Sequence, residues 1–264
     1  MLTMPIQIGK VIMSSINQRP EQYNYELIKI QDDIRDFFGW KLSDDLDSAE
    51  KLLDKINNSN VNNWSIINRE INLQNIIRKI NSNDNKIIII GAAVSTSEII
   101  EILKNKNLFV LADGAGAVFS TLNTKLAEEA WARSLCVISD GDGGIGLDIA
   151  IKKEIPIILH AHGDNIPSWT KIIDHALSST VDMKLVLTHQ LPMKIDGMYN
   201  FGGFTDGDRA VCFIHSLGVP KERILLIGTR TDIVGRWSGI TDNELKLSKL
   251  RWMEKVLQIL KINY

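Results

Sequence analysis

The chain has 264 residues, 44% of them hydrophobic, and a formal net charge of −2 at pH 7. This length fits one large domain or a large domain with a smaller one, and the apolar fraction is enough for a sizeable core. The near-neutral charge argues against nucleic acid as a partner, and no segment reaches the roughly 18 apolar residues of a membrane helix.

The chain start, Met-Leu-Thr-Met-Pro-Ile, has neither the basic residues nor the long apolar stretch of a signal peptide. Cys136 and Cys212 each stand alone in an apolar run, without the spacing of a metal site. This pattern indicates buried thiols in a reducing compartment. We therefore expect a cytoplasmic protein.

Residues 1–84 are mostly helical in pattern, with apolar stripes within 25–38, 46–56 and 71–80. The polar run at 81–85, Asn-Ser-Asn-Asp-Asn, indicates a hinge. We predict a smaller, mainly helical domain over residues 1–84 and a second domain over residues 85–264.

From residue 86 onward, short apolar runs alternate with helical stretches. Ser95 and Glu98 form a capping box that opens a helix, and the last helix is expected from about residue 243. The runs predict strands at 87–90, 108–111, 135–138, 157–159, 185–187 and 224–227. This alternation predicts an α/β fold with a parallel, Rossmann-like sheet and right-handed crossovers.

Polar residues and glycines follow the ends of these strands: Gly91, Asp113, Asp140, His160, His189 and Gly228. In an open parallel sheet, the carboxyl ends of the strands form the edge where ligands bind. We expect the functional site at this edge.

Asp140 and Asp142 lie two residues apart in a glycine-rich turn, and Asp164 follows the next predicted strand. Carboxylates so placed can hold Mg²⁺, whose octahedron phosphate oxygens complete. A solvated acidic turn is the plain structural alternative. We predict a metal site at Asp140, Asp142 and Asp164.

Residues 200–210 read Asn-Phe-Gly-Gly-Phe-Thr-Asp-Gly-Asp-Arg-Ala. The two glycines allow close approach of a ligand, and Thr205 can cap a helix whose first turn carries Asp206 and Asp208. The free N–H groups of such a helix start bind phosphate, and the acidic residues imply that the phosphate arrives with a metal ion.

Together, residues 111–115, 138–144, 160–165, 188–190 and 200–210 resemble the archaeal 6-hydroxymethyl-7,8-dihydropterin diphosphokinases, over about residues 87–257. Residues 112–114 and 139–142 more faintly resemble the thiamin diphosphokinases. The resemblance implies a thiamin diphosphokinase-like fold and an ATP- and Mg²⁺-dependent transferase. It would release AMP and serve tetrahydropterin biosynthesis of the methanopterin or folate type. Its partners would be small molecules, and a homodimer is compatible with it.

Such a transfer depends on alignment, charge neutralisation and positive charge on the leaving phosphate. We assign catalysis to Asp140, Asp142, Asp164, Asp206 and Arg209. Amides suit the edge of a pterin, and lysines spaced i,i+3 share one helix face. We assign binding of substrate and nucleotide to Asp113, Gly114, His160, His162, Asn165, Gln190, Asn200, Gly202, Gly203, Thr205, Arg236, Lys246 and Lys249.

Other functions remain open at this point. His160, His162 and Asp164 also match the zinc-binding opening of metallo-β-lactamase-like hydrolases, which need further histidines, and only His189 is well placed. Thiamin diphosphorylation, glycosyl transfer as in relatives of flagellin-modifying proteins, and a nucleotide sensor are the remaining alternatives. A sensor could dispense with the three aspartates.

Overall fold

The computed structural model describes residues 24–82, 84–179, 181–239 and 242–264. The chain start, from which a cytoplasmic location is predicted, lies outside these residues, as does residue 83 of the predicted hinge. Among the described helices, none is both long enough and apolar enough to cross a membrane.

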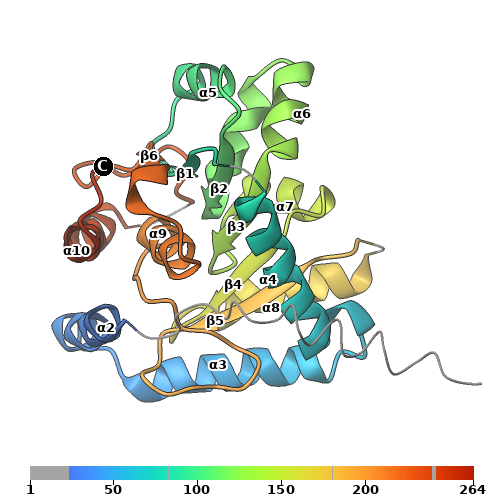
Figure 1. Ribbon diagram of the computed structural model, residues 1–264. Helices are drawn as coiled ribbons and strands as arrows, with labels where there is room; N and C mark the ends of the chain where they lie inside the picture. The colour runs from blue at the N-terminus through green and yellow to red at the C-terminus, as the bar shows by residue number, and fades with distance from the viewer. Residues whose placement is uncertain (1–23, 83, 180, 240–241) are drawn as a thin grey trace, which may run out of the picture.

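A parallel sheet forms the centre of the molecule (Figure 1). In the described part of the chain it has six strands in the order β5-β4-β3-β2-β1-β6, and every pairing is parallel. The strands are β1 Ile87–Ile90, β2 Leu108–Ala112, β3 Ser134–Ser139, β4 Ile157–Ala161, β5 Leu185–His189 and β6 Ile224–Ile227. The predicted α/β fold is confirmed.

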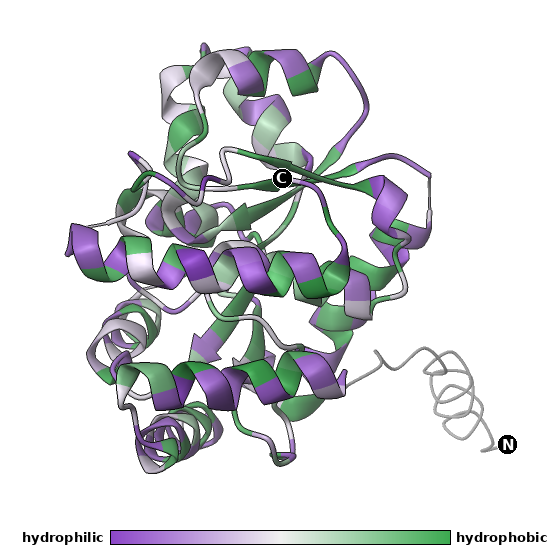
Figure 2. Ribbon diagram, turned by 90° about the vertical axis from the view of Figure 1, so that its left-hand side faces the viewer, coloured by the Kyte–Doolittle hydropathy of each residue, from purple (hydrophilic) through white to green (hydrophobic). Residues whose placement is uncertain are grey.

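Helices cover both faces of the sheet, and alternate strand residues face two separate cores. Ile88 and Ile90 belong to the core under α3, α5, α6, α7 and α8. Ile87 and Ile89 belong to the core under α2, α4, α9 and α10. Figure 2 shows the apolar sheet between helices that are striped in polar and apolar residues. The helices are α2 Tyr25–Phe38, α3 Leu42–Asn57, α4 Ile66–Asn81, α5 Thr96–Leu103, α6 Thr124–Ala132, α7 Gly144–Lys152, α8 Ile166–Ser178, α9 Asp206–Ser216 and α10 Asn243–Leu260.

The helices of the first 84 residues share these cores with the sheet. Leu52 of α3 lies in the first core and Ile76 of α4 in the second. The Asn72 amide of α4 donates to the Leu185 carbonyl of β5 at 3.1 Å, and the Trp64 indole donates to the Met183 carbonyl at 2.8 Å. The division at residue 84 stays a prediction.

The connections from β1 to β5 step in one direction across the sheet, and the β5–α9–β6 connection then returns to the far side of β1. Helix α9 packs against β1, β2 and β3 on its way back. This reversal beside β1 creates a crevice at the carboxyl edge, where ligands of open α/β sheets bind.

The two cysteines are buried, Cys136 in β3 and Cys212 in α9, and both are free thiols. Burial raises the pKa of each thiol above its ordinary value. The prediction that they are buried is confirmed.

Candidate functional site

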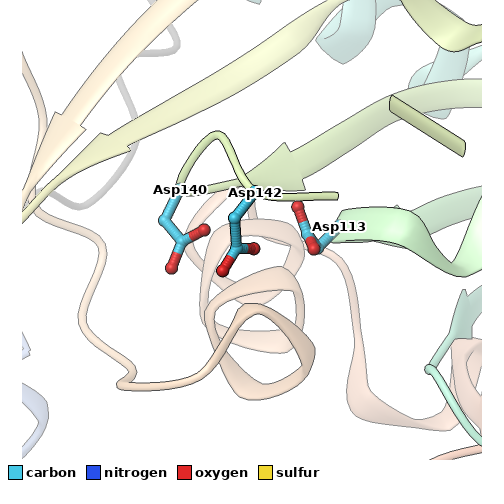
Figure 3. Close-up of side chains that lie close together, drawn as sticks. All are labelled: Asp113, Asp140 and Asp142. Atoms are coloured by element: carbon cyan, nitrogen blue, oxygen red, sulfur yellow. The ribbon is translucent and has the colours of Figure 1, made fainter. Parts of the chain in front are cut away.

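Three aspartates meet at the carboxyl edge of the sheet. Asp113 follows β2, and Asp140 and Asp142 follow β3. One carboxylate oxygen from each lies within 4.8 Å of the other two (Figure 3). Gly141 allows the tight turn between the last two, because its φ is +102° and a Cβ there would lie 2.8 Å from the backbone nitrogen of Trp169. The sequence therefore places three carboxylates around one point.

Asp140 has one oxygen bound and one free. Its Oδ2 lies 3.1 Å from Nε2 of His162, whereas its Oδ1 is buried with no hydrogen-bond partner among the described residues. A buried acceptor without a partner in a native protein is commonly explained by a water or an ion. The donor set, carboxylate oxygens only, suits a hard cation such as Mg²⁺.

The acidic groups of this edge repel one another. Burial and the nearby Asp206 and Asp140 raise the pKa of Asp113 well above its usual range. Burial and the Asp140 charge raise the pKa of Asp206 to about 7. A bound divalent cation would relieve this repulsion, since it brings two positive charges into the cluster.

Asp164 lies apart from this cluster. Its exposed side chain accepts a hydrogen bond from Nδ1 of His162 at 2.7 Å, and Nε2 of that histidine faces Asp140. The group that the structure brings together thus contains Asp113, expected to bind nucleotide, in place of Asp164. Asp113 follows the strand that neighbours β3, and this is the sequence signal that could have placed it.

The loop before α9 reaches the same edge. Gly202 and Gly203 both have φ +85°, and Thr205 is the N-cap residue of α9, as predicted. The carboxylate of Asp208 accepts the N–H groups of Phe204 and Thr205 at 2.6 and 2.7 Å, so this aspartate completes the cap. Asp206 is the acidic residue of the first turn that faces the cluster, since its charge acts on Asp113.

We expect Gly203→Val to impair nucleotide binding although Gly203 offers no side chain. A Cβ at this position would lie 2.7 Å from Cα and 2.8 Å from the backbone nitrogen of Arg209, so the first turn of α9 would have to move. Calorimetry should show an affinity for Mg–ATP at least tenfold lower. Gly218→Val is the control, because Gly218 has φ +80° but nothing within 4 Å of its would-be Cβ. Equal affinity in the two variants would contradict the role of this turn.

Asp206→Asn leaves the backbone of the α9 start unchanged. It removes a charge that acts on Asp113 and Asp140. We therefore expect it to lower turnover more than nucleotide affinity, measured as kcat against the Kd for Mg–ATP. A variant with normal turnover and weakened ATP binding would reverse this assignment.

A pocket opens between the ends of β1 and β6 and the helices α9 and α10. It encloses about 540 Å³, including space open to solvent, and Thr229 in its wall has a buried hydroxyl without a partner among the described residues. Its walls include Gly91, Asp113, Thr205, Gly228, Trp237 and Lys246. A Cβ on Gly228 would lie 2.2 Å from the backbone nitrogen of Val94, so glycine is required where the two loops meet.

His162 and Asn165 fix the acidic turn. The Asn165 amide donates to the backbone carbonyls of Asp140 at 2.9 Å and His160 at 2.6 Å, and its oxygen accepts the N–H of His162 at 2.9 Å. Burial lowers the pKa of His162, but the hydrogen bonds to Asp140 and Asp164 outweigh it and raise the pKa to about 9. These same contacts hold the pKa of Asp164 at about 2.

The raised pKa of His162 predicts a pH-dependent stability. The pKa of His162 in the folded protein, about 9, exceeds its ordinary value of 6.5. The stabilisation of the folded state by protonated His162 is therefore complete below pH 6.5 and is lost as the pH rises through 9. The free energy of unfolding, measured with urea and without Mg²⁺, should fall by about 3 kcal/mol more in wild type than in His162→Gln over this window. His175→Gln, at an exposed position of α8, is the control and should retain the wild-type slope.

Several residues expected to bind substrate are instead bound to other protein groups. The Asn200 amide donates to Gln31 Oε1 and to the Leu191 carbonyl, both at 2.9 Å. The Gln190 amide donates to both oxygens of Asp45, at 2.9 and 3.0 Å, and its oxygen accepts from Arg209 at 3.1 Å. His160 is buried beside Thr188. Their binding roles stay predictions.

Two charged residues from the N-terminal helices complete this network and carry no sequence signal. Arg35 of α2 donates to Asp45 of α3 and to the Gln190 carbonyl, each at 3.0 Å. Asp45 also accepts the N–H of Gly163 at 2.8 Å. A buried chain of contacts thus runs from Arg35 to Arg209.

The basic residues expected at the site have different neighbours. Arg209 stands between Asp206 and Gln190, and Lys246 lines the pocket. Lys249 lies over the Trp40 ring at 5.1 Å, and Arg236 over the Trp237 ring at 4.8 Å.

Gly114, also expected to bind substrate or nucleotide, packs against the glycine-rich turn that follows β3. A Cβ on Gly114 would lie 2.7 Å from the Gly143 carbonyl oxygen.

An open parallel sheet with glycine turns, a helix start and an acidic cluster at its carboxyl edge is typical of nucleotide-binding α/β proteins. Within the described residues, the cluster with metal-site geometry is made of carboxylates and does not include the histidines of the zinc alternative.

Comparison with known proteins supports the resemblance predicted from the sequence. The chain is similar to proteins named 6-hydroxymethyl-7,8-dihydropterin pyrophosphokinase from three archaea. It is 35% identical to the Pyrococcus furiosus protein over 133 residues, which is 48% of this chain and 54% of the relative. It is 28% identical to the Methanocaldococcus jannaschii protein over 191 residues (67% and 74%), and 30% identical to the Methanothermobacter thermautotrophicus protein over 136 residues (48% and 55%).

The matched stretch thus spans about half the length of two of these relatives and about three quarters of the third. No family model matches the chain, and no solved structure matches it.

Proposed function

We propose that this protein transfers a diphosphate from ATP to 6-hydroxymethyl-7,8-dihydropterin and releases AMP. The observation that carries the proposal is the unpartnered Oδ1 of Asp140 inside a group of three carboxylates, one of which, Asp113, lines the pocket beyond β1 and β6. The relatives named for this activity supply the substrate class. The reaction fits a cytoplasmic protein, because it draws on ATP.

Asp140, Asp142 and Asp113 would hold Mg²⁺ in this proposal. When bound, the ion neutralises phosphate charge and fixes the polyphosphate chain for in-line attack. Asp164 lies too far out to join the group directly, and His162 connects it to Asp140. We therefore assign Asp164 to the positioning of His162.

The nucleotide would occupy the pocket beyond the carboxyl ends of β1 and β6. The first turn of α9, at Asp206 and Gly207, lines this pocket and offers backbone N–H groups to phosphate, and Lys246 of α10 provides positive charge in the same pocket. The leaving AMP then develops negative charge near a cation, which lowers the barrier. Arg209 is held beside Asp206 and keeps that acidic side chain in place.

The pterin would lie on the β3–β4 side of the aspartates. Asp140 and Asp142 of the acidic turn would then lie between the pterin and the nucleotide, with the metal site beside both substrates. His162 and Asp164 are two polar groups on that side that are partly open to solvent.

The test is a direct comparison of alcohols under one condition. Protein, ATP and Mg²⁺ are incubated with 6-hydroxymethyl-7,8-dihydropterin or with thiamin, and AMP, ADP and the diphosphate product are quantified by chromatography. We expect AMP to form in step with the pterin diphosphate and kcat/KM to be far lower for thiamin.

The other results are equally informative. A preference for thiamin would replace the substrate class, and ADP as product would replace the reaction. Binding of ATP without turnover of either alcohol would favour the nucleotide sensor. A matched reaction with Ca²⁺ or EDTA in place of Mg²⁺ shows whether the activity depends on the metal.

A further inference from the structure

A small cavity lies between α9 and the ends of β3, β4 and β5. Three of the residues that line it have a buried nitrogen atom without a hydrogen-bond partner among the described residues. These atoms are Nε2 of His160, Nε2 of His189 and Nε of Arg209. These side chains are 3%, 1% and 6% exposed. Three orphaned polar atoms in one cavity are unusual, because native proteins nearly always satisfy such groups.

The protons of the two histidines can be assigned from their other contacts. The Thr188 hydroxyl donates to the Leu159 carbonyl at 3.2 Å, so it accepts from Nδ1–H of His160 at 2.9 Å. Burial lowers the pKa of His160 well below its ordinary value, which keeps the ring neutral. Its Nε2 therefore presents a lone pair to the cavity.

His189 has the opposite arrangement. Its Nδ1 accepts the backbone N–H of Leu191 at 3.0 Å, and burial lowers the pKa of the ring to about 4. The proton of this neutral ring is then on Nε2, which is a donor. Nε of Arg209 is a donor too, while its two terminal nitrogens face Asp206 and Gln190. The cavity thus presents two donors and one acceptor.

We propose that this cavity binds one water molecule that joins Arg209 to His160 and His189. The water accepts from Nε2–H of His189 and Nε–H of Arg209 and donates to Nε2 of His160. Buried waters typically make about three hydrogen bonds, and a site for one needs about 10–15 Å³ of room for the water centre. This cavity has about 10 Å³ of such room.

A halide or other small anion fits the same space less well. It would accept from His189 and Arg209, but it would face the lone pair of His160 with no proton between them. Of the other lining side chains, Ile138, Ile158, Phe201 and Phe213 are apolar, and the Thr188 hydroxyl already donates to the Leu159 carbonyl.

The water completes the surroundings of Arg209. Asp206 and Gln190 contact the terminal nitrogens, and the water contacts Nε, so each of the three guanidinium nitrogens has a partner. His160 and His189 are then positioning residues for Arg209. This catalytic consequence rests on the proposed function, whereas the water site itself does not.

The site is tested without substrate. Long-range ¹H–¹⁵N spectra of histidine-labelled protein at pH 7 should show His160 as the Nδ1–H tautomer and His189 as the Nε2–H tautomer. A crystal structure soaked in bromide should show density within about 2.7–3.2 Å of the three nitrogens and no anomalous signal there. Reversed tautomers, an empty cavity or a bromide peak would overturn the proposal.

A matched pair of variants isolates the water. His189→Asn keeps an acceptor near the Nδ1 position but removes the Nε2 donor, whereas His189→Gln keeps a donor near Nε2. Water-¹⁷O relaxation dispersion should report one long-lived water fewer in His189→Asn than in wild type, and the wild-type number in His189→Gln. An unchanged number in His189→Asn contradicts the site. With ATP and pterin, kcat should fall in His189→Asn more than in His189→Gln, while the water count stands whether or not the reaction is the one proposed.

Discussion

Asp140→Asn is expected to lower the rate of AMP release by about a hundredfold or more, since it removes charge at the point where phosphate charge must be neutralised. Asp142→Asn should act in the same direction. The side-chain volume is unchanged, and Asp140 Oδ1 is a buried carboxylate oxygen without a partner among the described residues. The measurement is AMP release across a Mg²⁺ titration, in which the half-saturating Mg²⁺ concentration should rise.

The substitution Asp142→Asn should affect thermal stability and turnover in different ways. Burial and the nearby charge of Asp140 raise the pKa of Asp142, so the two carboxylates repel each other when both are ionised. In the absence of Mg²⁺, Asp142→Asn should therefore have an unchanged or higher thermal midpoint while its turnover is low. Asp148→Asn, an exposed position in α7, is the charge-matched control and should retain full activity. Near-normal rates of AMP release in Asp140→Asn would contradict the proposal that Asp140 holds Mg²⁺ during the reaction.

Asp45→Ala is expected to destabilise the fold by about 3 kcal/mol, because it removes the buried carboxylate beside the Arg35 guanidinium and leaves that group only the half-exposed carboxylate of Asp32. Asp45 is 4% exposed and accepts hydrogen bonds from Arg35, Gln190 and the Gly163 backbone. Urea unfolding gives the size of the loss. The turnover of the folded fraction should fall as well, since Gln190 also contacts Arg209.

The control lies in the same helix. Asp47 forms an exposed ion pair with Lys51 at 2.6 Å, and exposed pairs contribute about 0–1 kcal/mol. Asp47→Ala should therefore change stability by less than about 1 kcal/mol and leave turnover unchanged. Equal losses in the two variants would show that the buried network is no more important than a surface pair.

The strands were predictable from the sequence because each is a short, largely apolar run bounded by turn and polar residues. The runs 87–90 and 224–227 match β1 and β6 to the residue, and the other four extend by one or two residues at their ends. The helix cap at Thr205 followed from local spacing. The carboxyl edge followed too, since parallel strands bring their ends together.

Contacts between distant segments were not predictable in this way. Nothing in the neighbourhood of Arg35 or Asp45 indicates that they meet Gln190, because the contact depends on how α2 and α3 pack at the β5 end of the sheet. Strand order alone predicts that Asp164 lies beside Asp140. The side chain of His162 occupies the intervening space, a detail that only the packing decides.

The return of the chain from β5 to β6 has a consequence for the order of assembly. Ile87 of β1 pairs with Ile224 of β6, so this edge of the sheet closes only after nearly all of the strands and helices between them exist. The aspartates come from the middle of the chain, whereas Thr205, Lys246 and the loop at 228–238 come later. During synthesis the acidic cluster therefore forms before the walls that enclose the nucleotide, and pairings so distant in sequence fold slowly. ATP, which would contact both parts in the proposed function, should speed the last step of refolding more than the first.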